Sequence, residues 1–293
     1  MYRSLHHKNL IVVFSLLFAC INLLPAEAQD ASGEDLVILY MNDTHSRIEP
    51  MPKSDSRNPD KGGVVRQNTY IEDVRSKNKN VLLFHCGDFV QGTPYFNLFS
   101  GETEVAVMNY MKFDAVTIGN HEFDNGLESL SEMIRKSEFP YVSTNLDFTG
   151  TPVEGLTKPF LIIQKGNIRV GIIGLTIDPD GLVTKKSYEG MKWNDPIASA
   201  NQMADYLRNE EKCDLIVCLS HLGLYFSEEK VGDISLAKQS RNIDIILGGH
   251  THTFLRFPEK IKNIDEKEVI ISQMGGNGIY VGRMDVNMKE VEK

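Results

Sequence analysis

Residues 112–126 read KFDAVTIGNHEFDNG, and this stretch places a group of polar side chains directly after a predicted buried strand. The apolar run at 115–118 predicts a short strand, and Gly119 ends it. Four side chains with hydrogen-bonding or metal-binding groups follow within five positions, namely Asn120, His121, Glu122 and Asp124. A surface turn does not need so many donors and acceptors. We therefore interpret this stretch as one corner of a functional site.

The rest of the chain alternates between apolar runs that predict strands and amphipathic segments that predict helices. Strands are predicted at 36–41, 81–86, 114–118, 141–144, 160–164, 168–175, 215–219, 243–247, 269–272 and 279–286. Helices are predicted at 64–74, 103–111, 127–137 and 196–211. This alternation predicts an α/β layered domain. A hairpin expected across residues 165–167 indicates a mixed sheet.

The N-terminus has the pattern of a secretory signal peptide. Arg3 and Lys8 precede an apolar run at 10–24, and small residues form a cleavage pattern at 26–28. We therefore expect removal of this segment and export of the mature protein to the periplasm or out of the cell.

Two alternatives for residues 1–28 stay open. A transmembrane anchor is disfavoured because the apolar run is short. A lipoprotein is the other, since residues 17–20 (LFAC) loosely resemble a lipidation site. In each case we expect residues 29–293 to form a single domain.

The composition excludes some classes of function. The net charge is −9, and the predicted signal peptide holds two basic residues and one acidic residue, so the mature protein is still more acidic. That charge argues against a general binder of nucleic acid or of acidic membranes. A local site must therefore hold any anionic substrate.

Three cysteines lie outside the signal peptide: Cys86, Cys213 and Cys218. Cys213 and Cys218 flank one predicted strand, and an extended strand would hold them roughly 16 Å apart and on opposite faces. That separation is beyond the reach of a disulfide. We expect all three to be buried thiols.

Histidines gather where predicted strands end. The six outside the signal peptide are His45, His85, His121, His221, His250 and His252, and only His85 is predicted to lie inside a strand. Ligands of α/β sheets bind at the carboxyl ends of strands. Taken singly, an Asp-x-His, a Gly-Asp or a buried histidine is more often structural. The Gly-His-Thr-His at 249–252 and the Asn-His-Glu at 120–122 are more specific, and together the motifs predict a metal site.

The order of these motifs resembles that of the calcineurin-like metallophosphoesterases. The matching residues are Asp43 and His45, Gly87 and Asp88, Gly119 to Glu122, His221, and Gly249 to His252. The further stretches MNDTH, KGGVVR, GDFVQGTPYFNLFSGE, STNL and GGHTHT look like the catalytic domain of exported 5′-nucleotidases. The resemblance spans residues 36–286. It implies a four-layer αββα sandwich with mixed β-sheets.

The resemblance also implies a role for each site residue. Asp88 would bridge two divalent metal ions, with Asp43, His45 and His252 completing one site and Asn120, His221 and His250 the other. His121 would stabilise or protonate the leaving oxygen, and Asp124 would orient it. Two such ions, two carboxylates and a bridging hydroxide leave a charge of +1, which attracts a phosphate anion. The ligands suit Mn²⁺, Zn²⁺ or Fe without choosing among them.

The implied reaction is attack of the metal-bridging hydroxide on a phosphate monoester, by preference a nucleoside 5′-monophosphate, to give nucleoside and phosphate. A phosphodiesterase or UDP-sugar hydrolase with the same site is an alternative. Full-length 5′-nucleotidases carry a second, C-terminal domain that clamps the base, and we expect this chain to lack that domain. The chain is therefore also considered as a catalytic subunit with a separate clamp-domain partner, or as a metal-binding module without turnover.

Overall fold

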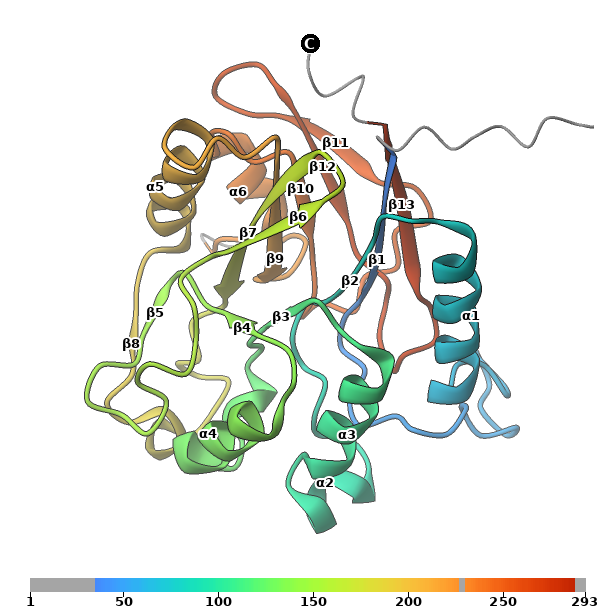
Figure 1. Ribbon diagram of the computed structural model, residues 1–293. Coiled ribbons are helices and arrows are strands. Elements are labelled where there is room, and N and C mark those ends of the chain that lie inside the picture. The colour runs from blue at the N-terminus through green and yellow to red at the C-terminus, as the bar shows by residue number, and fades with distance from the viewer. Residues whose placement is uncertain (1–34, 227–229, 288–293) are drawn as a thin grey trace, which may run out of the picture. The chain divides into compact units, whose positions relative to one another are not determined.

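Two β-sheets form the centre of the computed structural model, which describes residues 35–226 and 230–287 (Figure 1). The first has the order β13 (Gly282–Asn287), β1 (Asp35–Met41), β2 (Val81–His85), β3 (Ala115–Thr117) and β4 (Tyr141–Val142). The second has the order β11 (Glu259–Lys262), β12 (Glu268–Ser272), β10 (Ile245–Leu247), β9 (Leu215–His221), β7 (Ile168–Thr176) and β6 (Leu161–Lys165). β5 (Leu146–Asp147) and β8 (Lys192–Trp193) form a small additional pair.

Both large sheets are mixed, as predicted. β1, β2, β3 and β4 run parallel, and β13 joins the edge antiparallel to β1. In the second sheet β7, β9, β10 and β12 are parallel, while β6 and β11 are antiparallel edge strands. The predicted β6–β7 hairpin is confirmed, with Lys165 paired to Ile168 and Gly166 at φ 58° in the turn.

Helices cover the outer face of each sheet. The first sheet carries α1 (Val64–Lys77), α2 (Pro94–Phe99), α3 (Glu102–Met111) and α4 (Gly126–Lys136), whereas the second carries α5 (Pro196–Asn209) and α6 (Asp233–Gln239) (Figure 1). The 3₁₀ turns are η1 (His121–Phe123) and η2 (Lys185–Tyr188).

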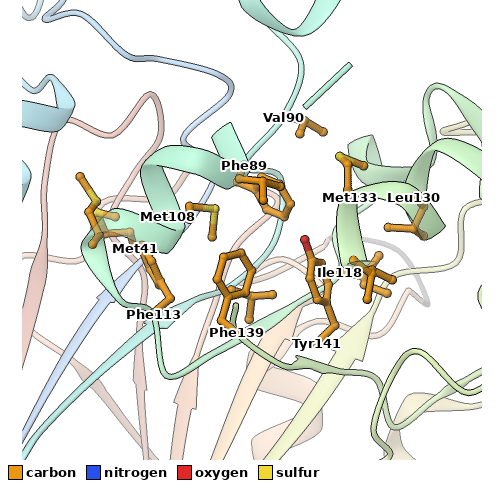
Figure 2. Close-up of a cluster of buried hydrophobic side chains, with 14 of the residues drawn as sticks. Met41, Phe89, Val90, Met108, Phe113, Ile118, Leu130, Met133, Phe139 and Tyr141 are labelled. Atoms are coloured by element: carbon orange, nitrogen blue, oxygen red, sulfur yellow. The ribbon is translucent and has the colours of Figure 1, made fainter. Parts of the chain in front are cut away.

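Alternation along the central strands produces three apolar cores. Leu36 and Ile38 of β1 face Ile172 and Val217 of the second sheet, and this cluster fills the space between the sheets. Alternate residues on β1 join the core beneath α1, α3 and α4, which Figure 2 shows around Met108 and Tyr141. A third cluster lies between the second sheet and α5 and α6. Strands buried on both faces explain the continuous apolar runs in the sequence. The predicted four-layer arrangement is confirmed.

Some local predictions differ from the structure. β4 ends at Val142 because the amides of Ser143 and Thr144 donate to Lys158 and Gly174 outside its ladder. The helices α2 and α6 were not predicted, since each is only six or seven residues long. The edge strand β11 was also missed, because its sequence EKIK is charged and mostly exposed.

The cysteines are free and buried, as predicted. However, Cys213 and Cys218 pack into the same core beside α5, not on opposite faces of a strand. The physical reason is that β9 begins at Leu215, so Cys213 lies in the preceding loop.

The predicted signal peptide lies outside the described residues. Within the described ranges, no helix is both long enough and apolar enough to cross a membrane.

Candidate metal centre

The carboxyl ends of five parallel strands bring the predicted ligands together. Asp43 and His45 follow β1, Asp88 follows β2, Asn120 follows β3, His221 ends β9, and His250 and His252 follow β10. The loops are joined by backbone hydrogen bonds, among them Asp43 N–H to Gly87 O at 3.0 Å and His45 N–H to Asp88 O at 3.1 Å. The site therefore lies where the carboxyl ends of strands from the two sheets come together.

One group of possible metal ligands contains Asp43, His45 and His252, whose ligand atoms all lie within 4.8 Å of one another. Oδ1 of Asp43 is 3.3 Å from Nε2 of His252 and 3.9 Å from Nε2 of His45. The two imidazole Nε2 atoms are 2.9 Å apart. A cation among these atoms would satisfy several lone pairs at once.

A second group contains Asp88, His221 and His250. Nε2 of His221 is 3.0 Å from Oδ2 of Asp88. Asn120 joins this group, because its Oδ1 lies 2.9 Å from Nδ1 of His250. A third combination, His45 with Asp88 and His121, connects the two groups through Asp88.

The tautomer of His221 supports a cation at this position. Its Nδ1 lies 2.7 Å from the carbonyl oxygen of Cys86, so Nδ1–H donates to that oxygen and Nε2 faces the site. That buried Nε2 has no hydrogen-bond partner, although a carboxylate oxygen of Asp88 lies near it. Nε2 and this carboxylate oxygen need a proton or a cation between them, so a metal ion can take the place of the proton at this position. Imidazole nitrogen with carboxylate oxygen suits Zn²⁺, Mn²⁺ or Fe.

Charges at this centre shift the pKa values of the buried groups. Burial raises the pKa of Asp88, but the neighbouring His221 and other histidines outweigh burial and hold it well below its usual range. Burial lowers the pKa of His221, but Asp88 and Asp43 outweigh it and raise that pKa to about 10. Burial, reinforced by His221, lowers the pKa of His250 to about 4. The centre thus favours positive charge close to Asp88.

Most of the predicted ligands have an unusual backbone conformation. Positive φ values occur at Asp43 (50°), His45 (48°), Asp88 (56°), His250 (70°) and His252 (51°). Such values are uncommon for residues other than glycine, and each costs on the order of 1–3 kcal/mol unless the surroundings enforce it. Strain of this kind concentrates at functional sites.

Two glycines allow the strand ends to approach each other. A Cβ at Gly119 would lie 2.3 Å from Oδ1 of Asp88, and a Cβ at Gly87 would lie 2.7 Å from Nδ1 of His221. Gly87 also has φ 83°. Neither position can accept a side chain without moving a candidate ligand.

His121 begins the turn η1 and is positioned by Asp124. Nδ1 of His121 lies 2.8 Å from Oδ2 of Asp124, and the His121 side chain is 30% exposed. Burial lowers the pKa of His121, but the hydrogen bond to Asp124 and the nearby carboxylates outweigh burial and raise it. Its ring centre is 5.3 Å from that of His45. The His121 imidazole is therefore partly accessible and is held in place by Asp124.

Glu122 anchors the polypeptide rather than facing the site. Its buried carboxylate accepts from the amides of Asp88 at 2.9 Å, Phe89 at 2.9 Å and Gly119 at 2.6 Å. Burial and the charge of Asp88 raise the pKa of Glu122 to about 7. This carboxylate thus joins the ends of β2 and β3.

Replacing Glu122 by Gln is expected to lower the free energy of unfolding by about 2–3 kcal/mol, because one acceptor oxygen becomes an NH₂ group opposite a backbone amide. Thermal melting followed by circular dichroism should show a decrease in Tm of roughly 4–12 °C. Glu128→Gln on the exposed face of α4 is the matched control. Equal Tm values for the two variants would contradict this role.

Two supporting residues were not predicted. Nδ2 of Asn42 donates to Oδ2 of Asp43 at 2.6 Å, while Gln273 donates to the carbonyl oxygen of Gly249 at 2.7 Å and accepts from Thr251 at 3.1 Å. Asn42 precedes Asp43 in the sequence, so its position beside the motif was the available signal. Gln273 follows β12 and has no motif that could have indicated it.

Comparisons with known proteins identify the family and the relatives of this chain. The sequence model of the family described as calcineurin-like phosphoesterase matches residues 36–254. A snake venom 5′-nucleotidase of Crotalus adamanteus is 31% identical over 97% of this chain and 50% of its own length.

Solved structures show the same likeness. The 5′-nucleotidase precursor of Thermus thermophilus superposes with a TM-score of 0.78 at 32% identity, over 86% of this chain and 51% of its own. The NAD nucleotidase of Haemophilus influenzae gives a TM-score of 0.76 at 30% identity, over 86% of this chain and 47% of its own. The chain thus spans about half the length of these relatives.

Proposed function

This chain belongs to the calcineurin-like phosphoesterase family, and we propose that it is a dinuclear-metal phosphomonoesterase that hydrolyses nucleoside 5′-monophosphates. The observation that carries the proposal is the position of Asp88, which groups with His221 and His250 on one side and with His45 and His121 on the other. A carboxylate shared by two sets of ligands is what a pair of metal ions requires.

The proposed ligands are Asp43, His45 and His252 for one ion, Asn120, His221 and His250 for the other, and Asp88 for both. When bound, the two ions would supply a nucleophile at neutral pH and neutralise charge on the phosphoryl group. Only Asp43 and Asp88 among these ligands are anionic, so the loaded site would attract a phosphate anion although the chain is acidic.

His121 is proposed to act on the leaving group. Its Nδ1–H donates to Asp124, which fixes the ring and leaves Nε2 for the substrate side. A protonated imidazole in this position can donate a proton to the departing oxygen. Asp124 supports the acid form through the hydrogen bond that raises the pKa of His121.

The proposed substrate class rests on the relatives and not on a base-binding pocket in the described residues. The relatives described above are named as nucleotidases of 5′-nucleotides and of NAD. A phosphodiesterase or a UDP-sugar hydrolase would use the same ligands, and the similarity to an NAD nucleotidase keeps that alternative open.

A substrate panel tests the proposal. The purified chain, with its metal content measured by elemental analysis, is assayed with AMP, bis-p-nitrophenyl phosphate and a UDP-sugar. We expect phosphate release from AMP to be fastest, with two metal ions per chain. Hydrolysis of the diester alone would contradict the monoesterase assignment, and a metal-free, inactive protein would contradict the whole proposal.

A separate partner chain that supplies a clamp domain is the second proposal, supported by the span of about half of each relative. Such a partner would lower KM for AMP. A monomeric preparation with a micromolar KM for AMP would contradict it.

Export also remains our prediction, and it rests on the sequence pattern of residues 1–28.

A further inference from the structure

A small cavity lined by both polar and apolar side chains lies directly behind the loop that carries Asp43 and His45. Its volume is about 30 Å³. Residues of that loop, of β2, α1 and α3, and of the segments that follow β2 and α3 form its walls. The polar residues in its lining include Thr44, Ser46, Arg47, His85 and Glu104. None of them is a proposed metal ligand.

Several buried polar atoms around this cavity lack a hydrogen-bond partner. They are both carboxylate oxygens of Glu104, Oγ of Ser46, Nε of Arg47 and Nδ1 of His85. Glu104 is only 4% exposed, so its carboxylate is removed from bulk water. Burying an unpaired carboxylate costs several kcal/mol, and such groups in folded proteins are normally satisfied by protein or by ordered water.

The size and chemistry of the cavity identify what satisfies them. A volume of about 30 Å³ holds one or two water molecules, and each needs two to four polar partners. Burial lowers the pKa of His85 to about 3, so this histidine is neutral. Its Nε2 lies 3.1 Å from Oγ1 of Thr44. Arg47 therefore contributes a positive charge, and Glu104 a carboxylate, to the lining of the same cavity.

We propose that ordered water in this cavity links the Glu104 carboxylate to Arg47 and Ser46, and that Glu104 is thereby a positioning residue for the loop that holds Asp43 and His45. The loop needs such support, because Asp43, His45 and Ser46 all have positive φ values of 48–53°. Backbone bonds from His45 and Ser46 to Asp88 and Phe89 fix one side of it. The hydrated Glu104–Arg47 pair fixes the other side.

This inference rests on the proposed metal centre, and metal titration separates the two. Calorimetric titration with Mn²⁺ is carried out on the unaltered chain, on Glu104→Gln and on Glu102→Gln. Glu102 is the matched control, because it lies on the same helix but is exposed and pairs with Lys136 at the surface, where an ion pair contributes little.

We expect Glu104→Gln to raise the Kd for one of the two Mn²⁺ ions by about 10-fold or more, because loss of a residue that orients a ligand has an effect of this size. The Kd for the other ion should change by less than about 2-fold. The Tm of the metal-free variant should also fall. If the unaltered chain binds no metal, the proposed function fails. If it binds metal and Glu104→Gln behaves like Glu102→Gln, the function stands and this inference is overturned.

Arg47→Met provides the second measurement, and it also serves if Glu104→Gln does not fold. Arg47→Met alone should weaken binding of the same Mn²⁺ ion. If the double variant Glu104→Gln/Arg47→Met folds, its loss of binding free energy should be smaller than the sum of the losses in the two single variants. Additive effects would overturn the link between Glu104 and Arg47. A high-resolution crystal structure should show water in the cavity, and a direct Glu104–Arg47 contact without water would overturn the bridge.

Discussion

Asp88→Asn is expected to remove both the bound metal and the turnover of AMP. The Asp88 carboxylate lies 3.0 Å from Nε2 of His221 and accepts the backbone N–H of His121 at 2.8 Å. Asparagine keeps the shape but removes one of only two negative charges among the proposed ligands. Loss of one partner of a buried charge pair costs about 3–5 kcal/mol, which corresponds to about 10²- to 10⁴-fold weaker metal binding.

Elemental analysis of Asp88→Asn and its kcat for AMP check this prediction. The matched control is Asp244→Asn, because Asp244 is a partly buried carboxylate at the opposite end of the second sheet. There it accepts from Arg208 and from the amide of Ile216 at 2.7 Å. The control should lose some stability but keep its metal and its kcat. An Asp88→Asn protein that retains two ions and ordinary turnover would refute the shared-carboxylate site.

His121→Ala is expected to lower kcat for AMP by about 10²- to 10⁴-fold, the range for a general acid, without loss of bound metal. His121 is the accessible imidazole at the centre, with its Nδ1 held by Asp124. The alcohol that leaves AMP is a poor leaving group and needs a proton. p-Nitrophenyl phosphate releases a stable anion, so the same variant should lose much less activity on it.

The comparison of leaving groups isolates the chemical role of His121. Equal losses on AMP and on p-nitrophenyl phosphate would show that His121 acts on the metal or on folding, and unchanged kcat would remove it from the mechanism.

Asp124→Asn tests how the His121–Asp124 pair sets the pH dependence of kcat. Asp124 raises the pKa of His121, so the acid form persists to higher pH in the unaltered chain. Loss of the carboxylate lowers that pKa, and the alkaline decline of kcat should then move to lower pH. A decline at unchanged pH would mean that His121 does not supply the proton.

The strand and helix pattern of the sequence predicted an α/β layered domain for local physical reasons, whereas the four layers and the ligands of the candidate site were implied by the resemblance to a family. Strands buried on both faces must be apolar along their whole length, so the runs at 81–86 and 168–175 were visible without a structure. Short elements such as α2 and β11 were missed, because they are stabilised by packing at an edge and not by a periodic apolar pattern.

The sequence by itself determined which chemistry is available: imidazole, carboxylate and amide side chains placed at the carboxyl ends of strands. Only the tertiary structure decided how those groups meet. It brought Oδ1 of Asp43 to 3.3 Å from Nε2 of His252, joined the Glu122 carboxylate to the amide of Asp88, and placed Glu104 in the cavity behind the loop that carries Asp43 and His45. The physical reason is that distances between strand ends depend on sheet order and on left-handed backbone turns, and tertiary packing has to enforce those turns.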